Sequence, residues 1–200
     1  GSAHVFLGNG DGGFKITRSE NAGTFSAAVS QTLQFSKTIA VADFNNDGFL
    51  DLVQDLHVNL GNGNGSFKTG QTWSSSATNL SEAIAIDINN DGNLDVAAAD
   101  FGLIRFALGN GNGSFSSVAT LQALGTAFHI SSGDFNSDGF IDIVTSDQNL
   151  GVALVYQGNG NGSFATSKSY VGPTEAREVN VGDLNGDGFK DVVSLALPAR

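Results

Sequence analysis

Four short acidic segments of the chain repeat one pattern, Asp-x-Asn-x-Asp-Gly-x-x-Asp. They occupy residues 43–51, 87–95, 134–142 and 183–191. Side-chain oxygens at alternate positions, followed by a glycine that turns the backbone sharply, are the ligand arrangement that a hard cation such as Ca²⁺ prefers. The sequence therefore predicts four calcium-binding loops.

In each loop we expect the side chains at positions one, three, five and nine and the backbone carbonyl at position seven to bind the ion. Position seven varies between Phe and Asn, which a backbone ligand allows. Aspartate at position nine replaces the more distant glutamate of an EF-hand loop. The expected ligands are Asp43, Asn45, Asp47, Phe49 and Asp51; Asp87, Asn89, Asp91, Asn93 and Asp95; Asp134, Asn136, Asp138, Phe140 and Asp142; and Asp183, Asn185, Asp187, Phe189 and Asp191. The alternative is four Asx-rich turns that bind no metal.

The acidity of the chain is mostly ligand charge under this interpretation. The formal net charge is −11, and the loops, with three aspartates each, hold twelve of the twenty acidic residues. Four calcium ions would bring the net charge to −3. With nine Lys and Arg and no basic run, the chain has no electrostatic basis for nucleic-acid binding. It also has no cysteine, and so no disulfide framework.

Other residues that are able to do chemistry form no catalytic pattern. The three histidines, His4, His57 and His129, are far apart in the sequence, and no Gly-x-Ser-x-Gly motif occurs. The Gly-Asn-Gly-Asn-Gly runs lack the Lys-Ser/Thr of a phosphate-binding loop, so we interpret them as hairpin turns. Three further aspartates, Asp55, Asp100 and Asp147, are interpreted as turn residues. The sequence thus indicates a protein that is not an enzyme.

The chain has one tryptophan, Trp73, in a polar segment between two repeats. It either covers the chain crossover after a fourth strand or lies exposed, where it would stack on a sugar or anchor a partner. Tyr170 and Arg177 lie in similar connecting segments and are weaker candidates for the same role.

A second motif alternates with the acidic loops and indicates which elements hold them. It reads Leu-Gly-Asn-Gly-x-Gly-x-Phe at 7–14, 60–67 and 108–115, and begins with Gln at 157–164. We expect the closing phenylalanines, Phe14, Phe67, Phe115 and Phe164, to pack between repeats. Between the two motifs lie short β-branched and aromatic runs bounded by Gly, Asn and Asp, which are typical of strands. Four antiparallel strands in roughly 50 residues make one blade of a β-propeller.

The sequence therefore predicts an all-β chain, a β-propeller of four repeats with about sixteen antiparallel strands. We expect a single domain over residues 1–200, with blade units at about 37–80, 81–126 and 127–176, and a fourth at 177–200 completed by 1–36. In that arrangement the N-terminal hairpin pairs with the C-terminal strands and closes the ring. The alternatives are that the chain is part of a larger ring or pairs its open edges with another copy. The linker over residues 15–42 is longer than its counterparts and has no assigned role.

Both motifs together resemble the FG-GAP or VCBS repeats of integrin α-subunit propellers and of many bacterial secreted proteins. The resemblance covers nearly the whole chain, with four copies of each motif. It implies a β-propeller with calcium in the loop that joins the first two strands of a blade. It also implies a role in cell adhesion, ligand binding or sugar recognition, since some members are lectins.

We therefore expect a calcium-stabilised, non-catalytic binding module, secreted or at the cell surface, where calcium is near millimolar. Its expected partner is a glycan or a protein surface. Nothing in the sequence indicates a nucleic-acid partner or a membrane span. Two alternatives remain: a structural or self-assembling propeller fragment of a larger secreted protein, with copies joined through open propeller edges, and an accessory part of a polysaccharide-degrading enzyme.

Overall fold

The computed structural model describes residues 38–55, 57–68, 71–73, 80–123, 127–147, 149–172 and 176–196, together with residues 3–5 and 29–31. In this part of the chain every regular element is a β-strand, and all pairings between strands are antiparallel. The predicted all-β class is confirmed.

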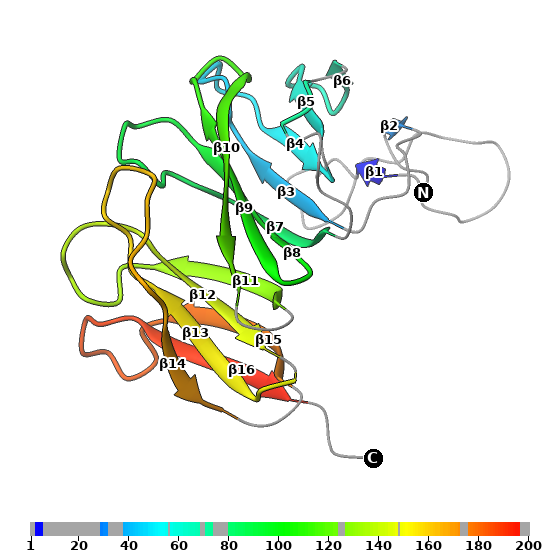
Figure 1. Cartoon of the computed structure of the whole chain (residues 1–200). Helices are drawn as coiled ribbons and strands as arrows, with labels where there is room; N and C mark the ends of the chain where they lie inside the picture. Colours follow the sequence, from blue (N-terminus) through cyan, green and yellow to red (C-terminus); the bar gives the residue numbers. More distant parts are fainter. Residues whose placement is uncertain are drawn as a thin grey trace, which may run out of the picture.

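The strands form three sheets of four strands and two sheets of two strands (Figure 1). Within each four-stranded sheet the strands follow one another in sequence order, as short hairpin connections require. The first sheet contains β3 (Ile39–Ala42), β4 (Asp51–Gln54), β5 (His57–Gly61) and β6 (Phe67–Lys68). The second contains β7 (Leu80–Ile86), β8 (Asp95–Asp100), β9 (Leu103–Gly109) and β10 (Phe115–Gln122). The third contains β11 (Ala127–Gly133), β12 (Asp142–Asp147), β13 (Val152–Tyr156) and β14 (Lys168–Val171). The two-stranded sheets are β15 (Ala176–Gly182) with β16 (Asp191–Ala196), and β1 (Ala3–Val5) with β2 (Val29–Gln31).

Successive sheets stack face to face in a row that runs from β3–β6 to β15–β16 (Figure 1). The first strands of neighbouring sheets touch: β3 contacts β7, β7 contacts β11, and β11 contacts β15. First strands that meet in this way along one side are the inner strands of propeller blades. The arrangement is therefore propeller-like.

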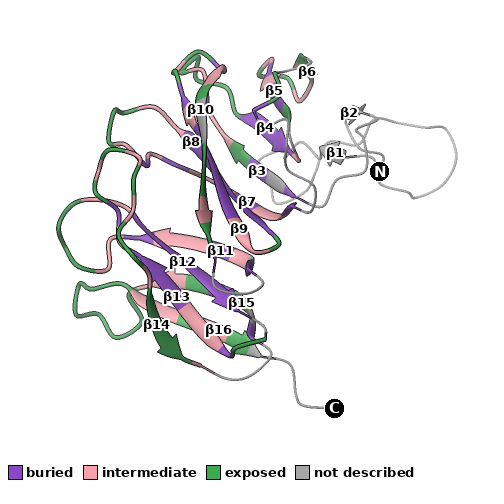
Figure 2. Cartoon of the chain, in the orientation of Figure 1, coloured by how far each residue is buried: buried purple, intermediate pink, exposed green. Residues whose placement is uncertain are grey.

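The hydrophobic core lies between the sheets rather than inside any one of them (Figure 2). One cluster fills the space between the first and second sheets and includes Val53, Val58, Trp73 and Val96. Another fills the space between the second and third sheets and includes Ile104, Ile130 and Leu154. Because each middle sheet is covered on both faces, all six residues of β8 are buried, and so are all six of β12.

The expected pairing of the N-terminal hairpin with the last unit is not found in the described residues. β1 pairs with β2, and β15 with β16 forms a separate sheet. The strand expected from Phe14 onward lies outside the described residues. Among the described residues, β15–β16 and β1–β2 therefore each have two strands.

Trp73 is not the exposed aromatic that one interpretation of the sequence required. Its side chain is 2% exposed, and its indole Nε1 donates to the carbonyl oxygen of Asp55 at 2.7 Å. The ring packs in the hydrophobic cluster between the first and second sheets, because an isolated apolar ring in a polar segment gains most from burial there.

Two of the motif phenylalanines pack between sheets, as expected. Phe115 meets Phe44 of the preceding sheet edge to face, with ring centroids 5.8 Å apart. Phe164 stacks on Phe106 at 5.1 Å. Phe67 is half-buried, and Phe14 lies outside the described residues.

Candidate metal centres in the acidic loops

The four acidic loops join the first and second strands of successive sheets and share one backbone fold. Asp43 at position one accepts hydrogen bonds from two loop N–H groups, those of Asp47 at 3.2 Å and Gly48 at 2.8 Å. Asn45 at position three accepts from the N–H of Asp47 at 3.0 Å and donates through Nδ2 to its carboxylate at 2.9 Å. Asp47 in turn accepts from the N–H of Phe49 at 2.9 Å. The side chains at positions one, three and five thus fold the loop around themselves.

The same bonds recur at Asp87 and Asp134. In the fourth loop Asp183 also accepts from the position-six glycine, Gly188, but its Oδ1 accepts from the N–H of Gly186 at 2.6 Å. The glycine at position six has φ between 83° and 88° in all four loops, as the predicted bend requires. A Cβ at Gly48 would meet nothing within 4 Å, so the backbone angle alone selects glycine there. Similar sequence patterns therefore give closely similar loops on different sheets.

Aspartate at position nine has a second role that the sequence analysis missed. In the first sheet, one oxygen of buried Asp51 accepts from the N–H of Phe44 at 2.9 Å and the other from the N–H of Gly61 at 2.8 Å. Asp95 and Asp142 make the same pair of bonds. The carboxylate therefore ties the start of its loop to the turn between the third and fourth strands. Each oxygen keeps a further lone pair for another partner.

The two repeated motifs are in contact in every complete sheet. The first glycine of the turn motif, Gly61, lies so close to the loop that a Cβ would overlap the carbonyl oxygen of Leu50. The second, Gly63, lies under the ring of Phe49, the residue at position seven. Phe140 covers Gly160 in the same way, and the side chain of Asn93 lies over Gly111. The glycines of one motif thus make room for the loop of the other, which explains why the motifs alternate.

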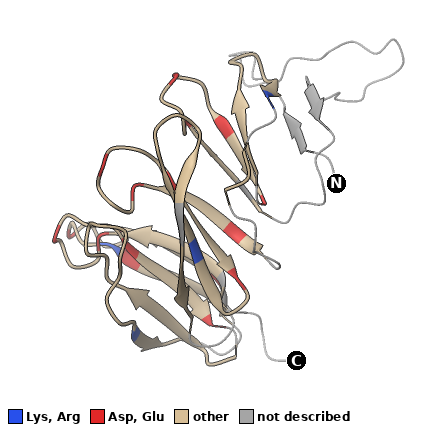
Figure 3. Ribbon diagram, turned by 45° about the horizontal axis from the view of Figure 1, so that its top comes forward, with Lys and Arg blue, Asp and Glu red and all other residues tan. Residues whose placement is uncertain are grey.

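Most of the negative charge of the loops has no neutralising cation among the described side chains. One exception is the fourth loop, where the N–H of Gly188 and, to a smaller extent, the charge of Lys190 lower the pKa of Asp183. Burial, together with the nearby carboxylates of Asp91 and Asp87, raises the pKa of Asp95 to about 6 against the lowering effect of its two N–H donors. The pKa values of Asp51 and Asp142 are raised by the same causes. The ion pairs found among the described residues, Arg105–Asp100 and His129–Glu82, do not involve a loop. Figure 3 shows where the acidic and the basic residues lie along the ribbon.

The donor set fits a calcium ion in its chemistry. Each loop offers three carboxylates, one amide oxygen and a backbone carbonyl, all hard oxygen donors. No group of three or more His, Cys, Asp and Glu side chains lies together at metal-holding distance in the described part of the chain. The loop carboxylates are turned instead toward the loop's own N–H groups. Like charges brought together and left uncompensated are the feature that a divalent cation would relieve.

The first loop touches the second loop and its turn at one end of the stacked sheets. Asn46 Nδ2 donates to Asn93 Oδ1 at 3.3 Å, which joins the first loop to the second. The N–H of Gly113, in the turn of the second sheet, donates to the carbonyl oxygen of Phe44 at 3.0 Å. Exposed rings of Phe49 and Phe189 lie on this surface. We refer to the four loops and their turns as the loop face.

The remaining candidate residues do not converge with the loops. Asp147 caps a turn, with Oδ1 accepting from the N–H groups of Asn149 and Leu150 at 2.8 Å each. Asp100 is instead half of a buried ion pair, 2.5 Å from Arg105 Nε, which the turn interpretation missed. The sequence did hold a signal for this ion pair: a basic residue lies five positions after an aspartate, on the next strand of the same hairpin.

The histidines and the remaining exposed candidates are also scattered. His129 Nδ1 lies 3.1 Å from Glu82 of the preceding sheet, and His57 Nδ1 lies 3.2 Å from the hydroxyl of Thr72. Tyr170 is exposed on β14. The side chains of His4 and Arg177 lie outside the described residues. The part of the chain that the structure describes has no helix long and apolar enough to cross a membrane.

Comparison with known proteins places this geometry in a family. The family model of the FG-GAP-like repeat matches residues 1–53, 87–145 and 134–194, which is more than half of the chain. A search of curated proteins found no match.

Two solved structures share the fold at low sequence identity. The first is a lectin from Agrocybe aegerita, described as recognising non-reducing terminal N-acetylglucosamine; it matches at 18% identity with a TM-score of 0.65. The alignment covers 94% of this chain and 54% of the lectin, so the chain spans about half of its length. The second, the Tc holotoxin pore of Photorhabdus luminescens, matches at 16% identity with a TM-score of 0.50, over 77% of this chain and 8% of that one.

Proposed function

The chain belongs to the FG-GAP-like repeat family, and on that premise we propose that it is a calcium-stabilised, extracellular recognition module that binds a glycan. Calcium would be held by the twenty residues at positions one, three, five, seven and nine of the four loops. When bound, it would supply the positive charge that the clustered carboxylates lack. The protein would then act by presenting a rigid loop face rather than by catalysis.

One observation carries the calcium part of the proposal: a carboxylate buried at position nine, beside two others, without a cationic partner in the described residues. Asp95 is the clearest case, since burial raises its pKa to about 6. A protein that kept such a carboxylate for structure alone would lose stability whenever it ionised. A divalent ion turns the same repulsion into attraction.

The same loops support the proposed extracellular location. Short loops with mixed Asp and Asn ligands bind calcium with weak to moderate affinity, and such sites fill where calcium is near millimolar. Ligand at 100 times its dissociation constant stabilises a fold by roughly 2.7 kcal/mol per site. Outside the cell, four filled sites would therefore stabilise the sheets strongly.

Recognition is assigned to the loop face because it is mixed in character. The first loop is hydrogen-bonded to the second loop and its turn, and the loops expose Asn side chains together with the rings of Phe49 and Phe189. Polar groups together with aromatic rings suit the hydroxyls and apolar faces of a sugar. The lectin neighbour, which recognises N-acetylglucosamine, favours glycans over proteins as the first ligand class to test.

A glycan array probed in calcium and again in EDTA tests this function. We expect binding to a restricted set of terminal sugars, with N-acetylglucosamine among those tested first, and loss of that binding in EDTA. Glycan recognition would be refuted if the protein, with its folding verified by circular dichroism, bound none of a diverse set of glycans in calcium. Turnover of a polysaccharide that survives EDTA would refute the non-catalytic assignment.

A structural or assembly role is the second candidate, and one observation favours it. The last sheet has only two strands in the described residues, so one edge of β16 has no partner there. An open edge of this kind joins to other strands.

A further inference from the structure

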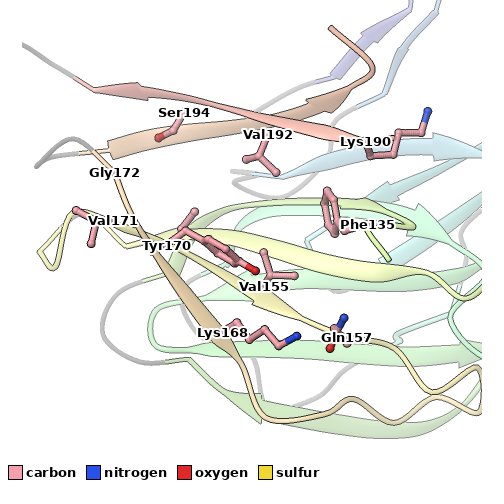
Figure 4. A pocket seen from close by; sticks show the side chains of 11 residues that line it. Phe135, Val155, Gln157, Lys168, Tyr170, Val171, Gly172, Lys190, Val192 and Ser194 are labelled. Atoms are coloured by element: carbon pink, nitrogen blue, oxygen red, sulfur yellow. The ribbon is translucent and has the colours of Figure 1, made fainter. Parts of the chain in front are cut away.

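A groove opens between the third sheet and the β15–β16 sheet (Figure 4). Its volume is about 570 Å³, which is within the range of roughly 300–1,000 Å³ that is usual for small-molecule sites. One wall is formed by β13 and β14, and the other by β16. One end of the groove reaches the loop face, because Phe135 of the third loop, Lys190 of the fourth loop and Gln157 of the turn motif line it.

The strand pairing sets which side chains of the third sheet face the groove. Ala153, Val155 and Gln157 alternate along one face of the sheet, in β13 and directly after it. On β14, Lys168 lies opposite Val155 and Tyr170 lies opposite Ala153, so both belong to the same face. This wall is therefore a row of side chains on paired strands.

The equivalent positions of the second sheet hold larger apolar side chains. Counted back from the first glycine of the turn motif, they are Ile104, Phe106 and Leu108. Ile104 and Phe106 belong to the core cluster between the second and third sheets, and Leu108 packs against it. The third sheet has a smaller side chain at two of these positions, Ala153 and Val155, and a polar one at the third. Less volume therefore fills the space beside the third sheet.

The opposite wall differs from its counterpart in the same direction. The groove residues contributed by β16 and the loop before it are Lys190, Val192 and Ser194. Counted from position nine of the loop, the counterparts in the preceding repeat are Ile141, Ile143 and Thr145. Ile143 is fully buried, and Ile141 packs against the core cluster. Side chains that fill one interface between sheets are thus replaced by smaller or polar ones in the next, so the groove has a cause in the side chains that line it.

Two lysines give the groove positive charge in a protein whose formal net charge is −11. Lys168 lies on the β14 wall and Lys190 on the β16 wall (Figure 4). Both side chains are exposed, and their flexible stems let the ammonium groups reach a ligand between the walls. An anionic group on a ligand would gain from both.

The remaining lining residues suit a sugar ring. Tyr170 is 54% exposed, and its ring is an apolar surface on which the hydrogens of a pyranose can lie. Phe135 and Val192 add apolar surface deeper in the groove. Gln157 and Ser194 offer hydrogen-bond donors and acceptors for hydroxyl groups. Apolar surface with a few polar groups placed around it is typical of small-ligand sites.

We infer that this groove binds an acidic sugar, a pyranose ring that carries a carboxylate as a hexuronic acid does. The carboxylate meets Lys168 and Lys190, and the ring lies on Tyr170. The ligand class rests on the proposed glycan recognition; the groove adds a defined place for the sugar and a preference for negative charge.

Calorimetric titration with two sugars that differ at one carbon tests the charge preference: methyl glucuronide and methyl glucoside. The titration is made in calcium, because the aspartates of the third and fourth loops lie at one end of the groove. We expect the glucuronide to bind about three- to tenfold more tightly, as two exposed ion pairs would give. Equal binding of the two sugars would overturn the inference. Sodium acetate should bind more weakly than the glucuronide, and equal binding of acetate would overturn the assignment to a sugar.

Variants test whether the acidic sugar lies in the groove. Lys168→Gln should weaken binding of the glucuronide by about two- to fivefold and leave binding of the glucoside unchanged. Lys68→Gln removes an equally exposed lysine on β6, outside the groove, and is the matched control that should change neither. Val155→Phe gives the third sheet the residue of the second at this position and should remove the preference for the glucuronide by filling the groove, in protein that circular dichroism shows to be folded. A preference that survives both Lys168→Gln and Val155→Phe would place the sugar elsewhere and contradict the inference.

This inference and the proposed function fail in different ways. Binding of neutral glycans without binding of the glucuronide would refute the acidic-sugar groove and leave glycan recognition standing. A chain that binds no sugar at all would refute both. A preference for the glucuronide that needs calcium but not Lys168 would place the carboxylate on an ion in the loops, and would also refute the groove.

Discussion

Removing one carboxylate from the third loop isolates what a single calcium ion contributes. Asp138 is exposed, accepts from the N–H of Phe140 at 2.9 Å and accepts from Asn136 Nδ2 at 2.8 Å. Because these bonds face solvent, Asp138→Ala should cost no more than about 0.5–1.5 kcal/mol in chelator. In calcium the same substitution also removes a ligand.

The expected loss in calcium is larger because binding to the folded state contributes stability by mass action. At a calcium concentration 100 times the dissociation constant, one site contributes about 2.7 kcal/mol. For a chain of this size 1 kcal/mol corresponds to about 2–4 °C in Tm, so loss of one site lowers Tm by roughly 5–11 °C. That drop should be seen in calcium in addition to the small change seen in EDTA.

Thermal melts followed by circular dichroism in calcium and in EDTA measure both values. Ser137→Ala is the matched control, since it changes the neighbouring residue of the same loop but no expected ligand; it should melt with the parent chain in both buffers. An equal drop for Asp138→Ala in the two buffers would show that the residue stabilises the loop without metal, and would refute the reasoning.

Three further results follow from the structure. In EDTA, the free energy of unfolding should fall as pH rises from about 4 to 7, because the pKa of Asp95 is about 6 in the folded state and the unfolded chain releases this proton at lower pH. Urea unfolding at several pH values measures how the free energy of unfolding changes with pH. Asp95→Asn should make that dependence weaker. Gly61→Ala should lower the free energy of unfolding by about 1–3 kcal/mol because the new Cβ would overlap a backbone carbonyl oxygen. Gly172→Ala is the control and should lower it much less, because the nearest atom to its Cβ lies at 3.7 Å. Equal losses in the two variants would contradict the close packing of the two motifs. Arg105→Met should lower the free energy of unfolding by about 3–5 kcal/mol because buried Asp100 loses the guanidinium of its ion pair, and a loss below 1 kcal/mol in urea unfolding would mean that this ion pair contributes little.

The sequence predicted the repeated parts of the structure well because their causes are local. The bend at Gly48 depends on one backbone angle, and the folding of the loop around Asp43 depends on residues within five positions. Alternation of the two motifs predicted antiparallel strands joined by tight turns. Local patterns of this kind can be interpreted one repeat at a time.

Contacts between distant residues were harder to predict because they depend on how strands and sheets pack. The buried indole of Trp73 donates to the carbonyl oxygen of Asp55, and nothing in its polar neighbours indicates this contact. The pairing of Asp100 with Arg105 depends on strand register and on the burial of both side chains.

The aspartate at position nine of each loop takes part both in a local pattern and in a contact with a distant residue. Its place in the loop pattern predicted a calcium ligand, which stays a prediction. Its bond to Gly61 joins two motifs ten residues apart and was not foreseen, although the regular occurrence of that glycine in each repeat was a usable signal.

Calorimetric titration of calcium into chelator-stripped protein tests the central claim most directly. The account predicts measurable heat with four ions bound per chain, and a rise in Tm over the same range of calcium concentration. A titration without heat, together with a melting temperature that does not respond to the metal, would contradict it.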